Sequence, residues 1–196
     1  MIAPRAPRLE HEDGELVIGA EGPAGVEGAR IVGADLGGAR LRGLRLTDVV
    51  VEGGNLANLA APEASLQRVV LTGARLTGVQ FTRGKMTDVV FRDCRIDLAT
   101  FAGTTFERAA FVGCLLGQAE FREALWRSVR FDHCELSEAD LTGLRIDGCE
   151  LHGCTLEAVT GLERLRGAAM PWADVVGHAG ELAAALGIRV LGDDGR

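Results

Sequence analysis

The sequence predicts a four-sided parallel β-helix with a short C-terminal helix, and a five-residue period carries that prediction. From Ile31 to Leu156 every fifth residue is large and apolar, except Ala61, and all seven phenylalanines occupy this position. The position two residues earlier most often holds alanine, with Val, Gly, Cys, Thr or Leu elsewhere, and it includes all five cysteines. A period of five fits neither an α-helix nor a single strand. It fits a chain that turns a corner in every unit, with the small and the large residue both pointing inward.

A longer period of 20 residues sets the number of units in each coil. Four cysteines recur at this spacing: Cys94, Cys114, Cys134 and Cys154. The outward residues Val50, Val70, Val90 and Ala110 recur at the same spacing. Twenty residues make four five-residue units, so each coil has four units. Successive coils should lie about 4.8 Å apart, which makes a rod on the order of 30 Å long. Phe91, Phe111 and Phe131 should then stack along one side.

Units such as Ala34-Asp35-Leu36-Gly37-Gly38 and Ala74-Arg75-Leu76-Thr77-Gly78 resemble the motif A(D/N)LxX of the pentapeptide-repeat family. The resemblance covers about residues 26–158 and implies a right-handed quadrilateral β-helix. Ala61 departs from the pattern, and Leu59 at the preceding small position can refill the volume.

The two ends follow different patterns. We expect residues 1–25 to form a tail and an irregular cap, 26–158 the β-helix, and 159–196 a C-terminal cap or dimerisation segment. A helix is predicted at about 171–186, starting at Pro171 and followed by a short strand at Ile188, Val190 and Leu191. One helical face collects apolar residues, namely Trp172, Val175, Val176, Ala179, Leu182 and Leu186. Resemblance to the mycobacterial fluoroquinolone-resistance members of the family implies a homodimer through this segment; the alternative is that the helix caps its own rod.

The residue types argue against catalysis, and we predict no enzyme activity, no metal and no cofactor. Thiols in a straight column cannot surround a tetrahedral ion, and buried cysteine serves as a small apolar filler. The four histidines have no ligand spacing. No uncharged apolar stretch of about 18 residues occurs, so we expect no membrane span and a cytoplasmic protein.

Charge distribution supplies the candidate partner surface. The net charge of −7 excludes a generally basic nucleic-acid-binding protein. Acidic residues gather near the C-terminal end of the repeats, and those proposed to bind a partner are Glu120, Glu123, Asp132, Glu135, Glu138, Asp140, Asp147 and Glu150. The resemblance implies a DNA-mimic interaction with a type II topoisomerase such as DNA gyrase, which would modulate quinolone action. Alternatively these carboxylates only keep the rod soluble.

A second hypothesis is a scaffold or adaptor for another protein. It would use the many arginines along the shaft and the outward apolar ridge of Val50, Val70, Val90 and Ala110, since such ladders often mark contact surfaces. The N-terminal tail covering this ridge, or the general suitability of β-branched residues for strands, would explain it equally well. A continuous acidic strip favours mimicry, whereas alternating charges along the shaft favour a scaffold.

Overall fold

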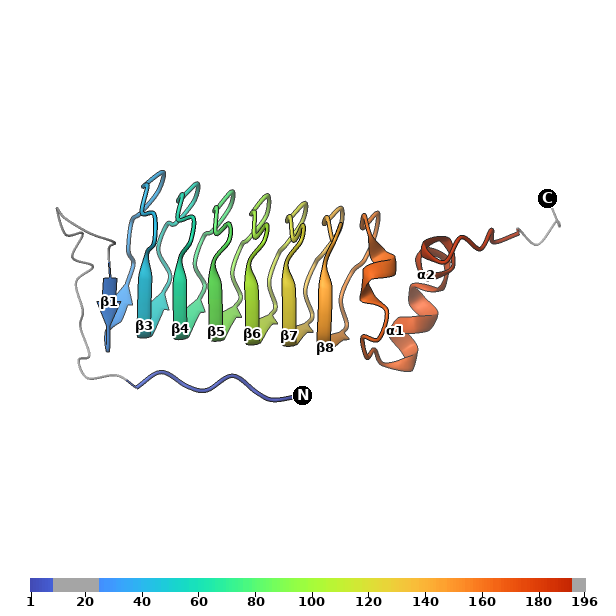
Figure 1. Ribbon diagram of the computed structural model, residues 1–196, viewed down its shortest axis with the longest axis horizontal. Coiled ribbons are helices and arrows are strands. Elements are labelled where there is room, and N and C mark those ends of the chain that lie inside the picture. The colour runs from blue at the N-terminus through green and yellow to red at the C-terminus, as the bar shows by residue number, and fades with distance from the viewer. Residues whose placement is uncertain (9–24, 192–196) are drawn as a thin grey trace.

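The computed structural model describes residues 1–8 and 25–191. It is a rod of stacked coils (Figure 1), and its strands run in the same direction on neighbouring coils. The strands are β1 (Gly25–Glu27), β2 (Arg30–Val32), β3 (Arg45–Glu52), β4 (Ser65–Thr72), β5 (Lys85–Arg92), β6 (Thr105–Val112), β7 (Leu125–Asp132) and β8 (Arg145–His152). The 3-10 helix η1 (Leu162–Leu165) and helices α1 (Trp172–Gly177) and α2 (Ala179–Ala185) follow them.

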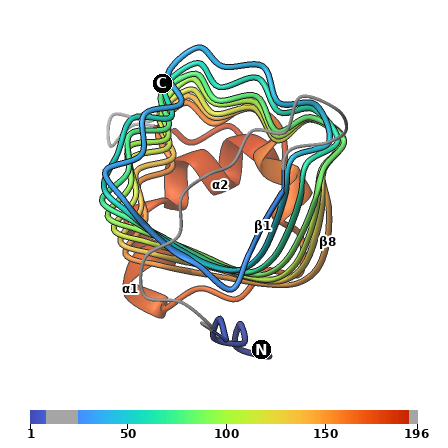
Figure 2. The same ribbon diagram turned by 90° about the vertical axis from the view of Figure 1, so that its left-hand side faces the viewer.

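Strand pairing confirms the 20-residue coil. Leu46 pairs with Leu66 and Val50 with Val70, and the same offset continues from β3 to β8. Isolated parallel bridges such as Asp35 to Asn55 and Arg40 to Ala60 join the coils on the remaining sides. The view along the rod shows the coils stacked in register around a four-sided outline (Figure 2). The predicted parallel β-helix is therefore confirmed.

The sides are named here from the coil of residues 50–68. Side 1 is 50–52, side 2 is 55–57, side 3 is 60–62 and side 4 is 65–67, with equivalent residues every 20 positions. The corners fall at 53, 58, 63 and 68. Corner residues have positive φ, for example 58° at Asn58 and 52° at Arg68. The corner between sides 4 and 1 is called the 4/1 corner; it holds residues 48, 68, 88, 108, 128 and 148.

Large side chains from successive coils stack inside the rod. The rings of Phe91 and Phe111 lie 4.8 Å apart and nearly parallel, and Phe111 and Phe131 repeat this arrangement at 4.8 Å. Ala61 and Leu59 are both fully buried, as expected if the larger Leu59 side chain fills the space that the small Ala61 leaves. The core is continuous from Ile31 to Leu165 because every coil adds one layer to it.

The five cysteines are buried and carry free thiols. The Cys94 and Cys114 thiols point at backbone carbonyl groups, with Cys94 Sγ 3.3 Å from the Arg92 oxygen and Cys114 Sγ 3.4 Å from the Phe91 oxygen. Burial raises the pKa of the Cys149 thiol to about 12. These thiols fill space beside the backbone and are sealed from solvent.

The C-terminal segment differs from the prediction in two respects. The single helix expected at 171–186 is broken at His178, whose φ of −107° and ψ of 19° leave the helical region. His178 Nε2 lies 2.8 Å from the Cys154 carbonyl oxygen, so the break ties the helices to the last coil. The strand predicted at Ile188, Val190 and Leu191 was wrong, because this segment is exposed and pairs with no described strand.

The N-terminal residues 1–8 lie against the rod rather than extending freely from it. They run back along its axis toward the C-terminal coils (Figure 1). Two backbone N–H groups anchor them, since Arg8 donates to Asp48 and Arg5 donates to Asp88. Most of the cap predicted within 1–25 lies outside the described residues.

Candidate protein-binding surface

The eight acidic residues proposed from the sequence do not share one face. Five gather on sides 2 and 3 and their adjoining corners, and we name these five the acidic edge: Glu120, Glu123, Glu135, Glu138 and Asp140. Glu123 and Glu138 occupy corners with positive φ, and Glu120 is bridged to Asp140 on the next coil. Asp132 and Glu150 lie on side 1 and Asp147 on side 4, because strands β7 and β8 carry them there.

The acidic edge is dense in charge. In the two coils of residues 111–150, sides 2 and 3 with their corners carry five carboxylates and Arg122, a net charge of −4. Two coils extend about 10 Å, which gives about one charge per 2.4 Å, against about one per 1.7 Å in duplex DNA. The same sides of the preceding four coils carry five cations and four carboxylates. The negative field is therefore confined to the C-terminal end.

Most carboxylates of the acidic edge face solvent without an ionic partner. Arg122 pairs with Asp140 at 2.5 Å; although burial raises the pKa of Asp140, hydrogen bonds from Thr142 and the Arg122 guanidinium lower it overall. Gln118 donates to Glu138 at 2.8 Å. Within the described chain, Glu120, Glu123 and Glu135 have no ion pair or side-chain hydrogen bond. These three can therefore meet a cationic partner without first breaking a contact.

The carboxylates outside the acidic edge are less available. Arg130 holds Asp132 in a two-pronged ion pair at 2.6 and 2.9 Å. Glu150 lies 3.2 Å from the His152 ring and 3.7 Å from the Met1 amino group. Only Asp147 among these three lacks a partner in the described chain. Three of the eight carboxylates proposed from the sequence therefore lie outside the acidic edge.

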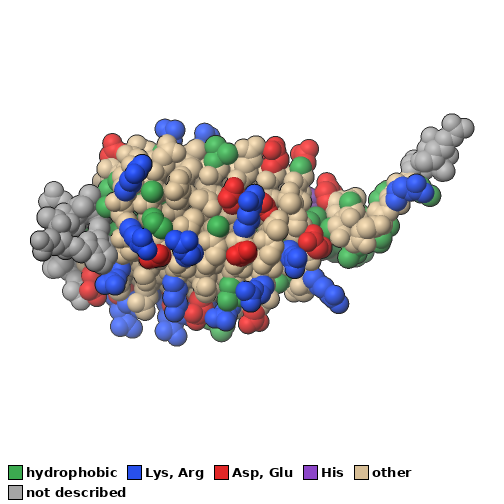
Figure 3. All heavy atoms as spheres, turned by 45° about the horizontal axis from the view of Figure 1, so that its top comes forward, with side chains coloured by type: hydrophobic (Ala, Val, Ile, Leu, Met, Phe, Trp, Pro, Cys, Tyr) green, Lys and Arg blue, Asp and Glu red, His purple; other side chains and the backbone are tan. Residues whose placement is uncertain are grey.

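Cations interrupt the remaining surface of the rod. Side 4 carries Arg45, Lys85, Arg127 and Arg145, and basic and acidic side chains are interspersed in Figure 3. A charge pattern of this kind runs against mimicry of DNA along the whole shaft. The acidic edge, in contrast, has a clear net negative charge.

The apolar ridge of Val50, Val70, Val90 and Ala110 is half-buried on side 1. Strand register places these four residues directly above one another. Residues 1–4 approach the last of them, because Met1 to Pro4 line a 250 Å³ pocket together with Ala110 and Ser128. The ridge therefore lies on the face along which the N-terminal segment runs.

The C-terminal helices leave an open apolar groove beyond the last coil. The groove has a volume of about 1010 Å³, and its lining includes Leu162, Leu165, Met170, Val175 and Leu182. Of the residues predicted for the dimer or cap, Trp172, Val176 and Leu186 are 78%, 56% and 74% exposed, Ala179 is exposed, and Val175 and Leu182 are half-buried. Helix α2 crosses the end of the rod (Figure 2) without closing the groove.

Neither a metal-binding cluster nor a membrane-spanning helix occurs in residues 1–8 and 25–191. No group of three or more His, Cys, Asp or Glu side chains there is arranged to hold a metal ion. The helices of this part of the chain are too short and too polar to cross a bilayer.

The stacked four-sided coils define a parallel β-solenoid built from five-residue units. A family model described as a pentapeptide repeat region matches residues 84–160, and a second one, for pentapeptide repeats in eight copies, matches residues 55–93. The chain therefore belongs to the pentapeptide-repeat family, whose members are generally non-catalytic structural or binding proteins.

Solved structures with related coils are distant in sequence. HetL, a pentapeptide repeat protein involved in heterocyst differentiation regulation from the cyanobacterium Nostoc sp. strain PCC 7120, is 20% identical, with a TM-score of 0.47 over 76% of this chain and 77% of its own. A trypsin-treated form of QnrB1, a plasmid-mediated fluoroquinolone resistance protein, is 15% identical, with a TM-score of 0.40 over 83% of this chain and 100% of its own. A pentapeptide repeat protein from the Arabidopsis thaliana thylakoid lumen is 18% identical, with a TM-score of 0.41 over 58% and 68%. Among curated proteins, none matches this sequence.

Sequence reasoning missed one cluster of charged residues. The 4/1 corner alternates Asp48, Arg68, Asp88 and Arg108 on successive coils, and each aspartate pairs with the arginine that follows it. The signal was present as an alternation of charge at a spacing of 20 residues. This alternation was overlooked because the apolar positions are sufficient to define the coils, and the charged corner positions were not compared from coil to coil.

Proposed function

We propose that the protein is a non-enzymatic binding module that presents its acidic edge to a protein surface shaped to hold DNA. A type II topoisomerase such as DNA gyrase is the partner class considered first, and the interaction would modulate quinolone action. The observation that carries this proposal is the net charge of −4 within about 10 Å of rod, close to the charge density of a duplex. A field of one sign steers association with a basic groove.

We propose further that two copies join through the C-terminal segment. The exposed side chains of Trp172, Val176 and Leu186 and the open groove beside α2 would bury apolar surface against a second copy. Joined in this way, the two acidic edges would lie on either side of the junction. A monomer in which the helices merely cap the rod would leave this surface in water.

A scaffold for a different protein is the second candidate function. The alternation of charge along sides 1 and 4 favours it, since a DNA mimic gains nothing from Arg45, Lys85 and Arg92. In that case the acidic edge would serve solubility, and gyrase would not respond.

The test of the acidic edge is inhibition of gyrase supercoiling by the purified protein. The wild type should inhibit, and less strongly as salt rises, because screening weakens exposed charges. The variant Glu120→Lys, Glu123→Lys, Glu135→Lys should need at least tenfold more protein, since it reverses three carboxylates that lack partners. The matched control Glu27→Lys, Asp93→Lys, Asp147→Lys makes the same change in net charge elsewhere and should inhibit like the wild type.

Two outcomes would contradict this proposal. Absence of inhibition by the folded wild type up to tens of micromolar would leave the scaffold function. Equal loss in both triple variants would show that overall charge, rather than the acidic edge, governs the effect.

Sedimentation equilibrium tests the dimer. The wild type should have twice the mass of the 20.7 kDa chain, and Trp172→Glu combined with Leu186→Glu should convert it to a monomer. Leu98→Glu, at a 57% exposed position on the shaft, is the control and should remain dimeric. A monomeric wild type, or a dimer that survives the double substitution, would contradict the proposed junction.

A further inference from the structure

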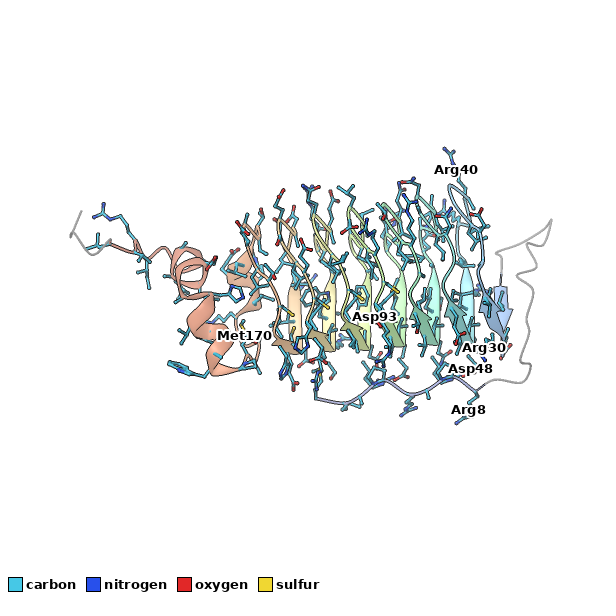
Figure 4. The ribbon with its side chains drawn as sticks, turned by 180° about the vertical axis from the view of Figure 1, so that it is seen from behind. Arg8, Arg30, Arg40, Asp48, Asp93 and Met170 are labelled. Atoms are coloured by element: carbon cyan, nitrogen blue, oxygen red, sulfur yellow. The ribbon has the colours of Figure 1, made fainter. Side chains whose placement is uncertain are left out.

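The N-terminal segment crosses the coils at a regular interval. Arg8 donates its backbone N–H to Asp48 Oδ1 at 2.9 Å, and Arg5 donates to Asp88 Oδ1 at 3.1 Å. Three residues of the segment therefore span two coils of the rod. Figure 4 shows Arg8 beside Asp48 on the edge of the rod that lies away from Arg40.

The sequence of this segment repeats with the same interval. Residues 3–8 read Ala-Pro-Arg-Ala-Pro-Arg, and each anchoring arginine directly follows a proline. Proline fixes φ and pushes the preceding residue to an extended conformation, which favours a polyproline II helix. That helix has three residues per turn and rises about 9.3 Å per turn. Two coils of the rod measure about 9.6 Å, so the two repeats match.

Burial shows which side of the segment meets the rod. Pro4 and Pro7 are partly buried, whereas Ala3, Arg5, Ala6 and Arg8 are exposed. A polyproline II helix places every third residue on the same side, so both prolines face the rod together. The charged arginine side chains are left in solvent, and their backbone N–H groups make the contacts.

The rod presents fixed acceptors to these N–H groups. Asp48 and Asp88 are 7% and 2% exposed, and an arginine of the following coil binds each in a two-pronged ion pair. Arg108 lies 2.7 and 3.0 Å from the two carboxylate oxygens of Asp88, and Arg68 binds Asp48 in the same way. We name the pairs Asp48–Arg68 and Asp88–Arg108 the two clamps. Because the arginine holds the carboxylate, the acceptor is oriented before any peptide binds.

An apolar floor lies next to the clamps. Val50, Val70, Val90 and Ala110 follow the 4/1 corner by two residues on each coil and form the ridge on side 1. The pocket at its C-terminal end is lined by Met1 to Pro4 and Ala110. Pro4 lies at the Ala110 end of this apolar strip, and the backbone N–H groups of Arg5 and Arg8 lie on buried acceptors. Together these are the two parts of a peptide-binding groove.

We propose that the 4/1 corner and the ridge on side 1 form a binding groove for polyproline II segments with proline at every third residue, and that residues 1–8 of this chain are its ligand, bound in cis. Backbone recognition makes the groove selective for conformation and proline spacing rather than for the remaining side chains. A segment of the same spacing on another protein can therefore take the place of residues 1–8. The acidic edge lies on the opposite sides of the rod, so this site is independent of the proposed function.

Hydrogen exchange of the full chain provides the first test. The amides of Arg5 and Arg8 should exchange at least tenfold more slowly than those of Ala3 and Ala6, giving protection at every third residue. Replacing both prolines, Pro4→Gly and Pro7→Gly, should abolish this protection because the segment loses its preformed helix. Ala6→Gly, at an exposed position that lines no part of the pocket, keeps both prolines and should retain most of the protection. Uniform exchange across residues 3–8 of the wild type would overturn the proposal.

Peptide binding tests the groove itself. A synthetic peptide of residues 3–8, labelled with a fluorophore, should bind the Pro4→Gly, Pro7→Gly chain at least tenfold more tightly than the wild type, whose own segment competes at high effective concentration. The same peptide with glycine in place of both prolines should bind neither chain. Since the substitutions lie outside the coils, the far-ultraviolet circular dichroism of both chains should agree. Failure of the proline peptide to bind the released groove would overturn the proposal.

Discussion

Replacing Phe111 with alanine is expected to lower the free energy of unfolding by about 4 kcal/mol, in the range found for large aromatic residues cut back to alanine in a core. Phe111 is fully buried, with Phe91 and Phe131 stacked 4.8 Å from it on the two neighbouring coils. Phe101 and Phe121 meet it edge-on at 6.4 Å. The backbone ladder fixes the spacing of the coils, so neighbouring layers cannot close around the cavity. Urea unfolding followed by circular dichroism measures the loss.

The matched control for Phe111 is Leu98→Ala. Leu98 is 57% exposed on a corner of the rod, and its truncation should change the unfolding free energy by less than about 0.5 kcal/mol. A loss of less than about 1.5 kcal/mol for Phe111→Ala would show that the coils do relax around the missing ring.

Replacing Asp88 with alanine is expected to cost about 3 kcal/mol, because it breaks a largely buried ion pair and removes the carboxylate that binds the Arg108 guanidinium through two hydrogen bonds. Arg108 would keep only Glu107, which lies 2.5 Å from it. The double variant Asp88→Ala, Arg108→Ala should recover part of this loss, since it leaves no buried charge. A double variant less stable than the single one would contradict the assignment of the cost to the stranded arginine.

Acid should remove the contribution of the same pair. The Arg108 guanidinium beside Asp88 lowers the pKa of that carboxyl below its ordinary 3.8. A depressed folded-state pKa gives stability that is fully present above the unfolded value and is lost as pH falls through the folded value. The difference between the wild type and Asp88→Ala should therefore be constant from pH 7 to about 5 and shrink below about 4. A constant difference down to pH 2 would contradict this linkage.

The sequence predicted the coils well because each residue contacts its equivalent at a constant separation of 20 residues. Inward positions hold apolar residues at a fixed spacing. The 20-residue interval between Phe91, Phe111 and Phe131 therefore predicts that their rings stack. Pairing of Val50 with Val70 needs no knowledge of distant segments, since the partner is always 20 residues away.

The ends and the surface were harder to predict because no repeat defines them. His178 breaks the C-terminal helix through a bond to the Cys154 carbonyl oxygen, and a helical period cannot reveal such a contact. Ile188 and Val190 alternate like a strand, yet find no described strand beside them. The acidic residues are close together in the sequence, but the coil distributes them over different sides of the rod. Glu135 lies on side 2, Asp132 on side 1 and Asp147 on side 4.

The spacing of the two clamps ties the length of the N-terminal segment to the length of the rod. A rod of this kind can be lengthened without a change of register only by whole coils, since only an insertion of 20 residues keeps every side aligned. Arg5 and Arg8 are three residues apart, whereas Asp48 and Asp88 are 40 apart. Insertion of one coil between the clamps would therefore misplace an anchor, and insertion of two would require one more Ala-Pro-Arg unit. In relatives that keep this groove, coils should be gained in pairs, each pair accompanied by three residues at the N-terminus.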